Sequence, residues 1–160
     1  MGRTGKEDDA LTNYHEKLIS FPEGELLARL IWGEARNQPL RGLAAIANVV
    51  LNRVHDDYKR FGKTVFDVIT KKWQFSCLNG LWSDDLSDDD PNLVQVLGDP
   101  KEPITACRTI AHLALDGLLI DPTGWATHYH TKTVDPKWND DPTKMIYTVT
   151  IGDHLFYREL

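Results

Sequence analysis

The sequence predicts an α+β fold in which helices come first and a small antiparallel sheet or hairpin ends the chain. Between residues 23 and 118, apolar side chains recur at spacings of three and four, the period of helices buried on one face. From residue 125 onward the segments are extended, and Gly152-Asp153 between two of them is a typical hairpin signal. The 160 residues suit one domain, so we expect a polar arm over residues 1–22 and a single domain over 23–160.

The first helices follow from the spacing of their apolar residues. In the arm, residues 11–18 predict one short helical segment, which Pro22 closes. Leucine and isoleucine side chains then recur along one face of residues 23–34, and Glu34 falls at the same period. The run 43–54 is apolar at helical spacing and rich in Ala, so it predicts a central, closely packed core helix.

Later helices are indicated by their start signals. Thr64 and Asp67 resemble a capping box that opens a short helix through Ile69. Residues 82–100 predict a polar loop. Five aspartates crowd in it: Asp84, Asp85, Asp88, Asp89 and Asp90. The next helix is predicted to open with a cap, a first-turn proline and a third-position acid, which are Asp99, Pro100 and Glu102.

The strands are predicted in the last 36 residues. Residues 125–131 form one extended segment, residues 146–151 alternate between apolar and polar, and residues 154–157 continue beyond the turn. The order of helices before strands, without an internal repeat or linker, is typical of an α+β domain.

Composition excludes several classes of protein. Hydrophobic residues make up 41% and charged residues 26%, which is ordinary for a globular domain, and no apolar run approaches the roughly 20 residues of a membrane span. Eighteen Lys and Arg against 24 Asp and Glu give a net charge of −6, so nucleic-acid binding is not expected. Cys77 and Cys107 are too few and too far apart for a disulfide framework or a zinc knuckle, and we expect buried thiols.

Glu34 is the first candidate for chemistry. Its period places it on an apolar stripe at the C-terminal end of a helix, where burial and the negative end of the helix dipole both favour the protonated carboxylic acid. Such an acid can protonate a leaving oxygen. The structural alternative is that Glu34 caps its own helix or pairs with Arg36 or Arg53.

Three histidines form a second candidate set. Alternation along an extended segment sends Thr127 and Tyr129 to one face and His128 and His130 to the other. Together with His154, the two histidines would give the three protein ligands of a catalytic zinc ion. No HExxH helix or close cysteine supports that hypothesis, and structural histidines are the simpler interpretation.

Aromatic residues indicate a sugar ligand. There are five tryptophans: Trp32, Trp73, Trp82, Trp125 and Trp138. Three of them, Trp73, Trp125 and Trp138, stand near polar side chains, a combination that suits the apolar faces and hydroxyls of sugar rings. Core packing is the alternative for the tryptophans. The aspartates at 84–90 lack the Gly and Glu of an EF-hand, so a solvated loop is expected there instead of a calcium site.

A set of ordered motifs carries a family resemblance. Residues 31–36 read Ile-Trp-Gly-Glu-Ala-Arg, and residues 42–54 read Gly-Leu-Ala-Ala-Ile-Ala-Asn-Val-Val-Leu-Asn-Arg-Val. Further matches are Gln74-Phe75-Ser76, Ala114-Leu115-Asp116-Gly117, Thr127-His128-Tyr129-His130 and His154 with Phe156-Tyr157. In this order and spacing, from about Glu25 to the end, the chain resembles the SleB/CwlJ-type cell wall hydrolases, the family of spore cortex-lytic enzymes with bacterial and phage members.

The resemblance implies a compact, lysozyme-like domain that acts as a peptidoglycan lytic transglycosylase, with Glu34 as the catalytic acid and then base. In that reaction the acid protonates the oxygen between N-acetylmuramic acid and N-acetylglucosamine, and the muramoyl 6-hydroxyl closes a 1,6-anhydro ring. No metal or other cofactor is then needed. The substrate-binding candidates at matched positions are Gln74, Phe75, Thr127, Tyr129 and His130. Asn52 and Arg53 either orient Glu34 or hold a helix end.

Three alternatives stay open from the sequence. A hydrolytic muramidase would use water in place of the 6-hydroxyl. A zinc amidase would use His128, His130 and His154, with Glu34 as base. A catalytically inactive wall-binding module would need none of these roles.

The remaining expectations concern partners and location. We expect a monomer whose partner is the peptidoglycan glycan strand, without nucleic acid and without stable membrane insertion. The first residues carry no secretory signal, so we expect synthesis in the cytoplasm and action on the cell wall, after release by a holin or delivery in a virion, as for a phage endolysin.

Overall fold

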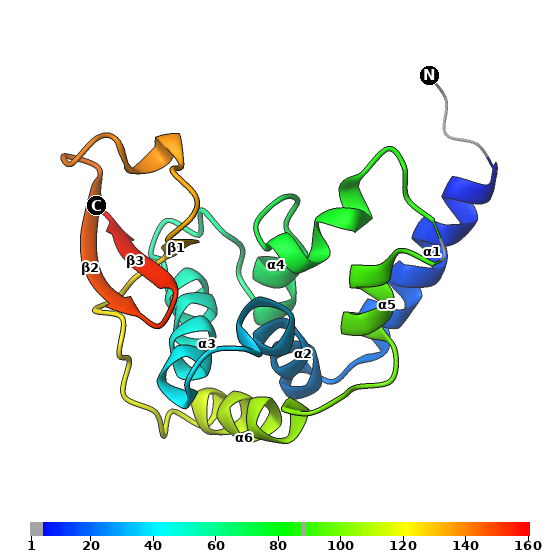
Figure 1. Ribbon diagram of the computed structural model, residues 1–160, viewed down its shortest axis with the longest axis horizontal. Helices are drawn as coiled ribbons and strands as arrows, with labels where there is room; N and C mark the ends of the chain where they lie inside the picture. Colours follow the sequence, from blue (N-terminus) through cyan, green and yellow to red (C-terminus); the bar gives the residue numbers. More distant parts are fainter. Residues whose placement is uncertain (1–4, 88) are drawn as a thin grey trace.

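Helices come first along the chain and a three-stranded antiparallel sheet ends it, which confirms the predicted α+β class (Figure 1). A computed structural model describes residues 5–87 and 89–160. The elements are α1 (Gly5–Ser20), α2 (Glu23–Ala35), α3 (Leu40–Val54), α4 (Val65–Thr70), η1 (Ser76–Trp82), α5 (Pro91–Leu97), α6 (Ile104–Leu115), β1 (His128–Thr131), η2 (Lys137–Asn139), β2 (Met145–Ile151) and β3 (His154–Glu159). No helix in the described ranges has the length and apolar character that crossing a membrane requires.

The core lies where α2, α3 and α6 pack together, with the sheet beside α3 and with α1 and α5 at the opposite end (Figure 1). Leu27 and Ile31 of α2 and Ile46 of α3 have no exposed surface, as the helical spacing of apolar residues predicts. A Cβ atom at Gly24 would lie 2.8 Å from the ring of His112, so glycine is what lets α2 approach α6 so closely. Glu34, on the last turn of α2, is thereby carried to the edge of the core.

The sheet has the order β1-β3-β2, and all neighbours are antiparallel. Gly152 begins the two-residue turn between β2 and β3 with a φ of 57°, in the region that glycine adopts most readily. The side-chain amide of Gln38 clamps this turn, because it accepts from the N–H of Asp153 at 2.9 Å and donates to the Asp153 carboxylate at 3.0 Å. The clamp fixes the tip of the hairpin to the segment that leads into α3.

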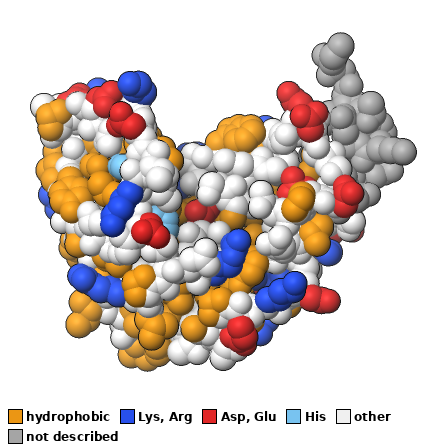
Figure 2. Space-filling model, in the orientation of Figure 1, with side chains coloured by type: hydrophobic (Ala, Val, Ile, Leu, Met, Phe, Trp, Pro, Cys, Tyr) orange, Lys and Arg blue, Asp and Glu red, His pale blue; other side chains and the backbone are white. Residues whose placement is uncertain are grey.

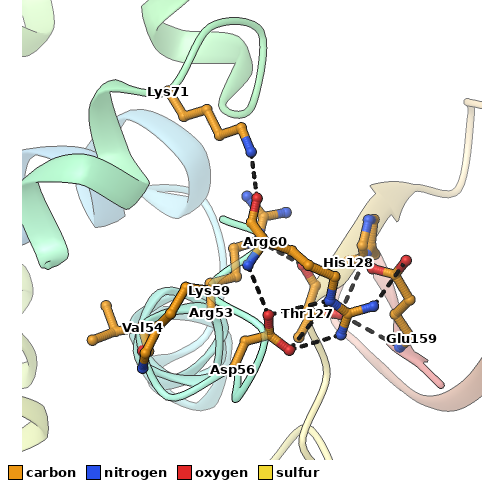
Figure 3. Close-up of polar contacts among 9 residues, drawn as sticks. All are labelled: Arg53, Val54, Asp56, Lys59, Arg60, Lys71, Thr127, His128 and Glu159. Atoms are coloured by element: carbon orange, nitrogen blue, oxygen red, sulfur yellow. Dashed lines mark hydrogen bonds and ion pairs between the residues drawn. The ribbon is translucent and has the colours of Figure 1, made fainter. Parts of the chain in front are cut away.

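A second set of contacts fixes the other end of the sheet to α3 (Figure 3). Arg60, just beyond α3, pairs with Asp56 at 2.8 Å and with Glu159 of β3 at 3.1 Å. Lys71 donates to the backbone oxygen of Arg60. The sheet is therefore held beside α3 at both ends, which fixes its position relative to the helix.

Three predictions about local structure need correction. The helical segment in the arm is longer than 11–18, since α1 spans Gly5–Ser20, and its Tyr14 and Leu18 are buried against the core. The predicted polar loop at 82–100 contains α5, which Asp90 caps by accepting from the N–H groups of Asn92 and Leu93. The Asp-Pro start and the buried Leu93, Val96 and Leu97 were its signals, masked by the aspartates around them.

The start of α6 also differs. The helix begins at Ile104 after Pro103, and not at Pro100. Glu102 is the residue that satisfies the free donors there, because its carboxylate accepts from the N–H of Thr105 at 3.3 Å and from the Thr105 hydroxyl at 2.6 Å. Thr64 is the N-cap of α4, as its hydroxyl accepts from the N–H of Asp67 at 3.1 Å, but the return bond of a capping box is replaced by one from the N–H of Lys63 to the Asp67 carboxylate at 3.3 Å. Both cysteines are buried free thiols, as expected.

Candidate active site

A groove of about 490 Å³ lies where the end of α2 meets α3, the start of η1 and the sheet. In the space-filling view the molecule is hollowed between the part that carries the sheet and the helical remainder (Figure 2). The lining residues are Gly33, Glu34, Arg53, Trp73, Gln74, Ser76, Asn79, Tyr129, His130, Thr131, Val134, Pro136, Trp138 and His154. Among the described lining residues, Glu34 is the only acid.

Glu34 is half-buried and held by donors from a distant part of the chain. The Ser76 hydroxyl lies 3.1 Å from Oε2 and 3.3 Å from Oε1, and the backbone N–H of Cys77 donates to Oε1 at 3.0 Å. These donors come from the first turn of η1, whose leading N–H groups have no partner within the helix. Glu34 therefore bridges the C-terminal end of one helix and the N-terminal end of another.

Tyr129 lies on the sheet side of Glu34. Burial, followed by the negative charge of Glu34, raises the pKa of the Tyr129 phenol well above its usual range. The phenol therefore stays protonated close to the carboxylate, as a group that can donate a hydrogen bond. Burial and the Glu34 charge also raise the pKa of the Cys77 thiol well above its usual range, so Cys77 is an inert thiol beside the acid.

Arg53 is a buried cation beneath the groove, with 4% of its surface exposed. Its Nε donates to the backbone oxygen of Thr127 at 2.7 Å (Figure 3), and its guanidinium lies 5.1 Å from the ring centre of Phe61 and 4.9 Å from that of Phe75. Burial lowers the pKa of Arg53, while Tyr129 and Glu34 act in the opposite direction. A guanidinium remains charged in proteins, so Arg53 supplies positive charge close to the acid.

Three buried atoms of the groove's residues find no hydrogen-bond partner in the described part of the chain: Nη1 of Arg53, Oδ1 of Asn79 and Nδ1 of His154. Buried polar atoms are paired in the great majority of cases, and each exception needs a physical explanation. His154 is 3% exposed, and burial lowers its pKa, so the ring is neutral near pH 7. These three atoms are enclosed behind the surface of the groove, so the residues that carry them line it with other atoms.

The histidines do not assemble into a metal site. His154 packs edge-on against Tyr129 and Phe156, whereas His128 and His130 contact Trp138 on the other face of the sheet. In the described ranges no group of three His, Cys, Asp or Glu side chains could hold a metal ion. The zinc-amidase alternative is therefore wrong in its geometry, because antiparallel pairing of β1 with β3 sends His154 away from the other two.

Both ring nitrogens of His130 have partners in the sheet. Its Nε2 lies 3.1 Å from the hydroxyl of Tyr157 and its Nδ1 lies 2.8 Å from the backbone oxygen of Thr131. His128 lies between Phe61 and Trp138, and burial followed by the charges of Arg53 and Arg60 lowers its pKa to about 4.

Of the five predicted substrate-binding residues, the structure brings Gln74, Tyr129 and His130 into the groove. Phe75 and Thr127 are buried outside its lining, with 2% and 7% of their surface exposed. Direct contact with a substrate does not fit these two positions, because the Phe75 ring and the Thr127 backbone oxygen are used to hold Arg53.

Asn52 and Arg53, whose roles the sequence leaves open, also lie in different places. Arg53 lines the groove, whereas Asn52 holds a loop, since its amide donates to the Asp121 carboxylate at 3.0 Å and to the backbone oxygen of Ala126 at 2.9 Å. Ser76 belongs to the Gln74-Phe75-Ser76 motif, which by itself predicts no role for the hydroxyl, and nothing in the sequence distinguishes Asn79 as a lining residue. Of the three predicted sugar-stacking tryptophans, Trp73 and Trp138 line the groove and Trp125 does not.

Fold and groove together define an α+β domain with one carboxylate among the described residues of its groove. The chain belongs to the cell wall hydrolase family, whose sequence model matches residues 37–157. The match begins three residues after Glu34, so the first helices lie outside it.

Individual relatives agree with the family. The chain is 31% identical over 150 residues to the spore cortex-lytic enzyme of Halalkalibacterium halodurans, covering 88% of this chain but only 38% of that protein. The chain thus spans well under half the length of this curated relative. It is also similar to the catalytic domain of the Bacillus cereus SleB protein, with a TM-score of 0.62 and 27% identity over 84% of this chain and 88% of that one. A third relative is the catalytic domain of the germination-specific lytic transglycosylase SleB from Bacillus anthracis, with a TM-score of 0.61 and 28% identity over 84% of this chain and 92% of that one.

Proposed function

We propose that this domain is a peptidoglycan lytic transglycosylase that cleaves the bond from N-acetylmuramic acid to N-acetylglucosamine and leaves a 1,6-anhydro product. The observation that carries the proposal is that Glu34 is the only acid among the described residues that line the groove. A relative named as a lytic transglycosylase is 28% identical in sequence to the chain over the aligned region and supports the assignment.

Glu34 carries out both proton transfers in this proposal. As a carboxylic acid it donates its proton to the glycosidic oxygen while the C–O bond breaks, and the departing sugar leaves as an alcohol. The Glu34 carboxylate then takes the proton from the muramoyl 6-hydroxyl, whose oxygen forms the new bond to C1. Glu34 thus ends the cycle protonated, as it began.

The neighbours of Glu34 suit these two steps. The Cys77 N–H and the Ser76 hydroxyl donate to the carboxylate, so they stabilise the charged form that exists between the two transfers. Glycosidases with two carboxylates need the second one about 5 to 9.5 Å from the first to attack the sugar or activate water. An internal 6-hydroxyl nucleophile needs no such partner.

The rest of the groove supplies binding groups for sugars. Trp73 and Trp138 offer aromatic faces, and Trp73 is 57% exposed with a φ of 61°, a backbone conformation uncommon for a bulky residue. The polar side chains of Gln74, Asn79 and Thr131 line the same groove, and amide and hydroxyl groups are of the kind that bind hydroxyl and acetamido groups. We assign the glycan strand to this groove because it combines exposed aromatic faces with polar side chains.

The deciding experiment is mass spectrometry of the muropeptides released from purified peptidoglycan by the wild type and by Glu34→Gln. We expect anhydromuramoyl products from the wild type and a loss of at least about 100-fold in the variant, the scale of general acid catalysis. Gln keeps the shape of the side chain, so the melting temperature should stay within a few degrees. A variant that retains more than a tenth of the activity would overturn the role of Glu34.

The same spectra separate the second candidate. A hydrolytic muramidase could use Glu34 and the same groove, but its products would be heavier by one water. Released free peptides would contradict glycan cleavage altogether, and no release from the wild type would leave a wall-binding module. The monomeric state and the holin or virion route to the wall stay predictions of the sequence.

A further inference from the structure

A second hollow of the described molecule is larger than the groove of Glu34. It has a volume of about 600 Å³ and lies at the ends of α3 and α6. Arg53 lines the groove, whereas its chain neighbours Asn52 and Val54 line this second hollow, so the last turn of α3 separates the two. The other lining residues are Glu23, Asn48, Leu51, His55, Lys63, Thr64, Val65, Ala114, Leu115, Gly117, Leu119, Asp121 and Trp125.

Trp125 stands in this hollow with 66% of its surface exposed. Its φ of 66° is in the left-handed region, an outlier for a bulky residue, and Trp73 in the groove has the same kind of backbone. Asp121 fixes this conformation, because its carboxylate accepts from the Trp125 N–H at 3.1 Å and from Asn52 at 3.0 Å. The fold thus holds an indole ring in water instead of burying it.

Around the ring the hollow combines an apolar floor with free polar groups. Leu51, Leu115 and Leu119 supply apolar side chains. Within the described part of the chain, the side chains of Glu23, His55 and Lys63 form no hydrogen bond or ion pair, so they are available to a ligand.

The charges in the hollow favour a neutral ligand. Both oxygens of Asp121 are occupied by Asn52, Thr123 and Trp125. The free charges are then one carboxylate, on Glu23, and one ammonium group, on Lys63. The Glu23 carboxylate would repel an anion and the Lys63 ammonium group would repel a cation. A neutral molecule with hydrogen-bond donors and acceptors can bind both groups.

We propose that this hollow is a noncatalytic sugar site that holds a neutral acetylated hexosamine ring of the glycan against Trp125. An apolar ring face and outward hydroxyl or acetamido groups match an exposed indole with Glu23, His55 and Lys63 around it. The identity of the sugar rests on the proposed function. Two sugar sites on one domain would keep the domain bound to the insoluble wall between cleavages. While one site holds the glycan, the other site stays close to the wall and meets a high effective concentration of sugar.

The test measures cosedimentation with purified, insoluble peptidoglycan in a Glu34→Gln background, so that turnover does not remove the ligand. Trp125→Ala should bind at least fivefold more weakly, and Trp125→Tyr, which keeps an aromatic ring, should bind within twofold of the parent. Ile120→Ala is the matched control, since Ile120 is 93% exposed in the same loop but does not line the hollow. Melting temperatures of all variants establish that they fold.

A soluble probe locates the contact. Titration with chitotriose, a neutral N-acetylglucosamine trimer, should shift the NMR signals of Trp125, His55 and Lys63 in the Glu34→Gln protein. Trp125→Ala with Glu34 intact should cleave short soluble glycans at the wild-type rate and insoluble wall several-fold more slowly.

Three outcomes would overturn the sugar site. These are equal binding by Trp125→Ala and its parent, no shift of the three signals with chitotriose, or a concentration-dependent dimer that Trp125→Ala dissociates, which would make the hollow a contact between copies. Failure of the proposed function looks different. In that case the wild type releases no anhydro product, although the binding defect of Trp125→Ala remains.

Discussion

Oε1 of Glu34 lies 3.0 Å from the backbone nitrogen of Cys77, 43 residues further along the chain. The contact joins the last turn of α2 to the first turn of η1. The Cys77 N–H has no partner within η1, and the Glu34 carboxylate lies at the negative end of the α2 dipole, so each group stabilises the other. An acid held in this way keeps one position before and after it transfers its proton.

Of the two groups that donate to the Glu34 carboxylate, the Ser76 hydroxyl is the one that a substitution can remove, because the other is the backbone N–H of Cys77. We expect Ser76→Ala to lower kcat about tenfold, or roughly 1.4 kcal/mol, because the carboxylate loses one donor while the Cys77 N–H remains. Rates on purified peptidoglycan check this. Ser76→Thr keeps the hydroxyl and should recover most of the rate, and Ser20→Ala removes an exposed hydroxyl of α1 as a control. An unchanged kcat in Ser76→Ala would show that the donor is dispensable.

Arg53 should prove important for stability. Lysine at this position would lose the bond to the Thr127 oxygen or the contact with the rings of Phe61 and Phe75, since its ammonium group lacks the planar fork of arginine. We expect Arg53→Lys to lower the free energy of unfolding by about 2 kcal/mol or more, measured by urea denaturation. The exposed Arg41→Lys should change it by less than about 0.5 kcal/mol. Equal stability of the two variants would contradict the structural role.

His128 should give stability a dependence on pH. Its pKa is lowered to about 4 by burial and then by the charges of Arg53 and Arg60, while in the unfolded chain it is about 6.5. Between these values the unfolded chain binds more protons, so the free energy of unfolding should fall as the pH is lowered from 6.5 to 4.

Two measurements check this dependence. NMR titration of the His128 ring should give a midpoint near pH 4, and His128→Gln should flatten the stability curve in that window. His15→Gln, a change at an exposed residue of α1, should leave the curve as it is. A His128 midpoint near 6.5 would contradict the prediction.

Local patterns were sufficient for the elements with strong periodicity or capping. The helices around Leu27 and Ile46, the N-cap at Thr64 and the turn at Gly152 are all encoded within a few residues, and the structure confirms them. The helix at 91–97 was missed because seven residues show barely two turns of periodicity, and its polar neighbours obscured the pattern.

The sequence by itself determined the fold class, the family motifs and the choice of Glu34 as the candidate acid, because these depend on spacing along one stretch of chain. Only the tertiary structure decided which distant groups meet that acid. It brought Ser76, Tyr129 and Arg53 to the groove, buried Phe75 and Thr127 beneath it, and turned His154 away from the other histidines. The reason is physical, since helix packing and strand register fix contacts between residues tens of positions apart, and no local pattern records them.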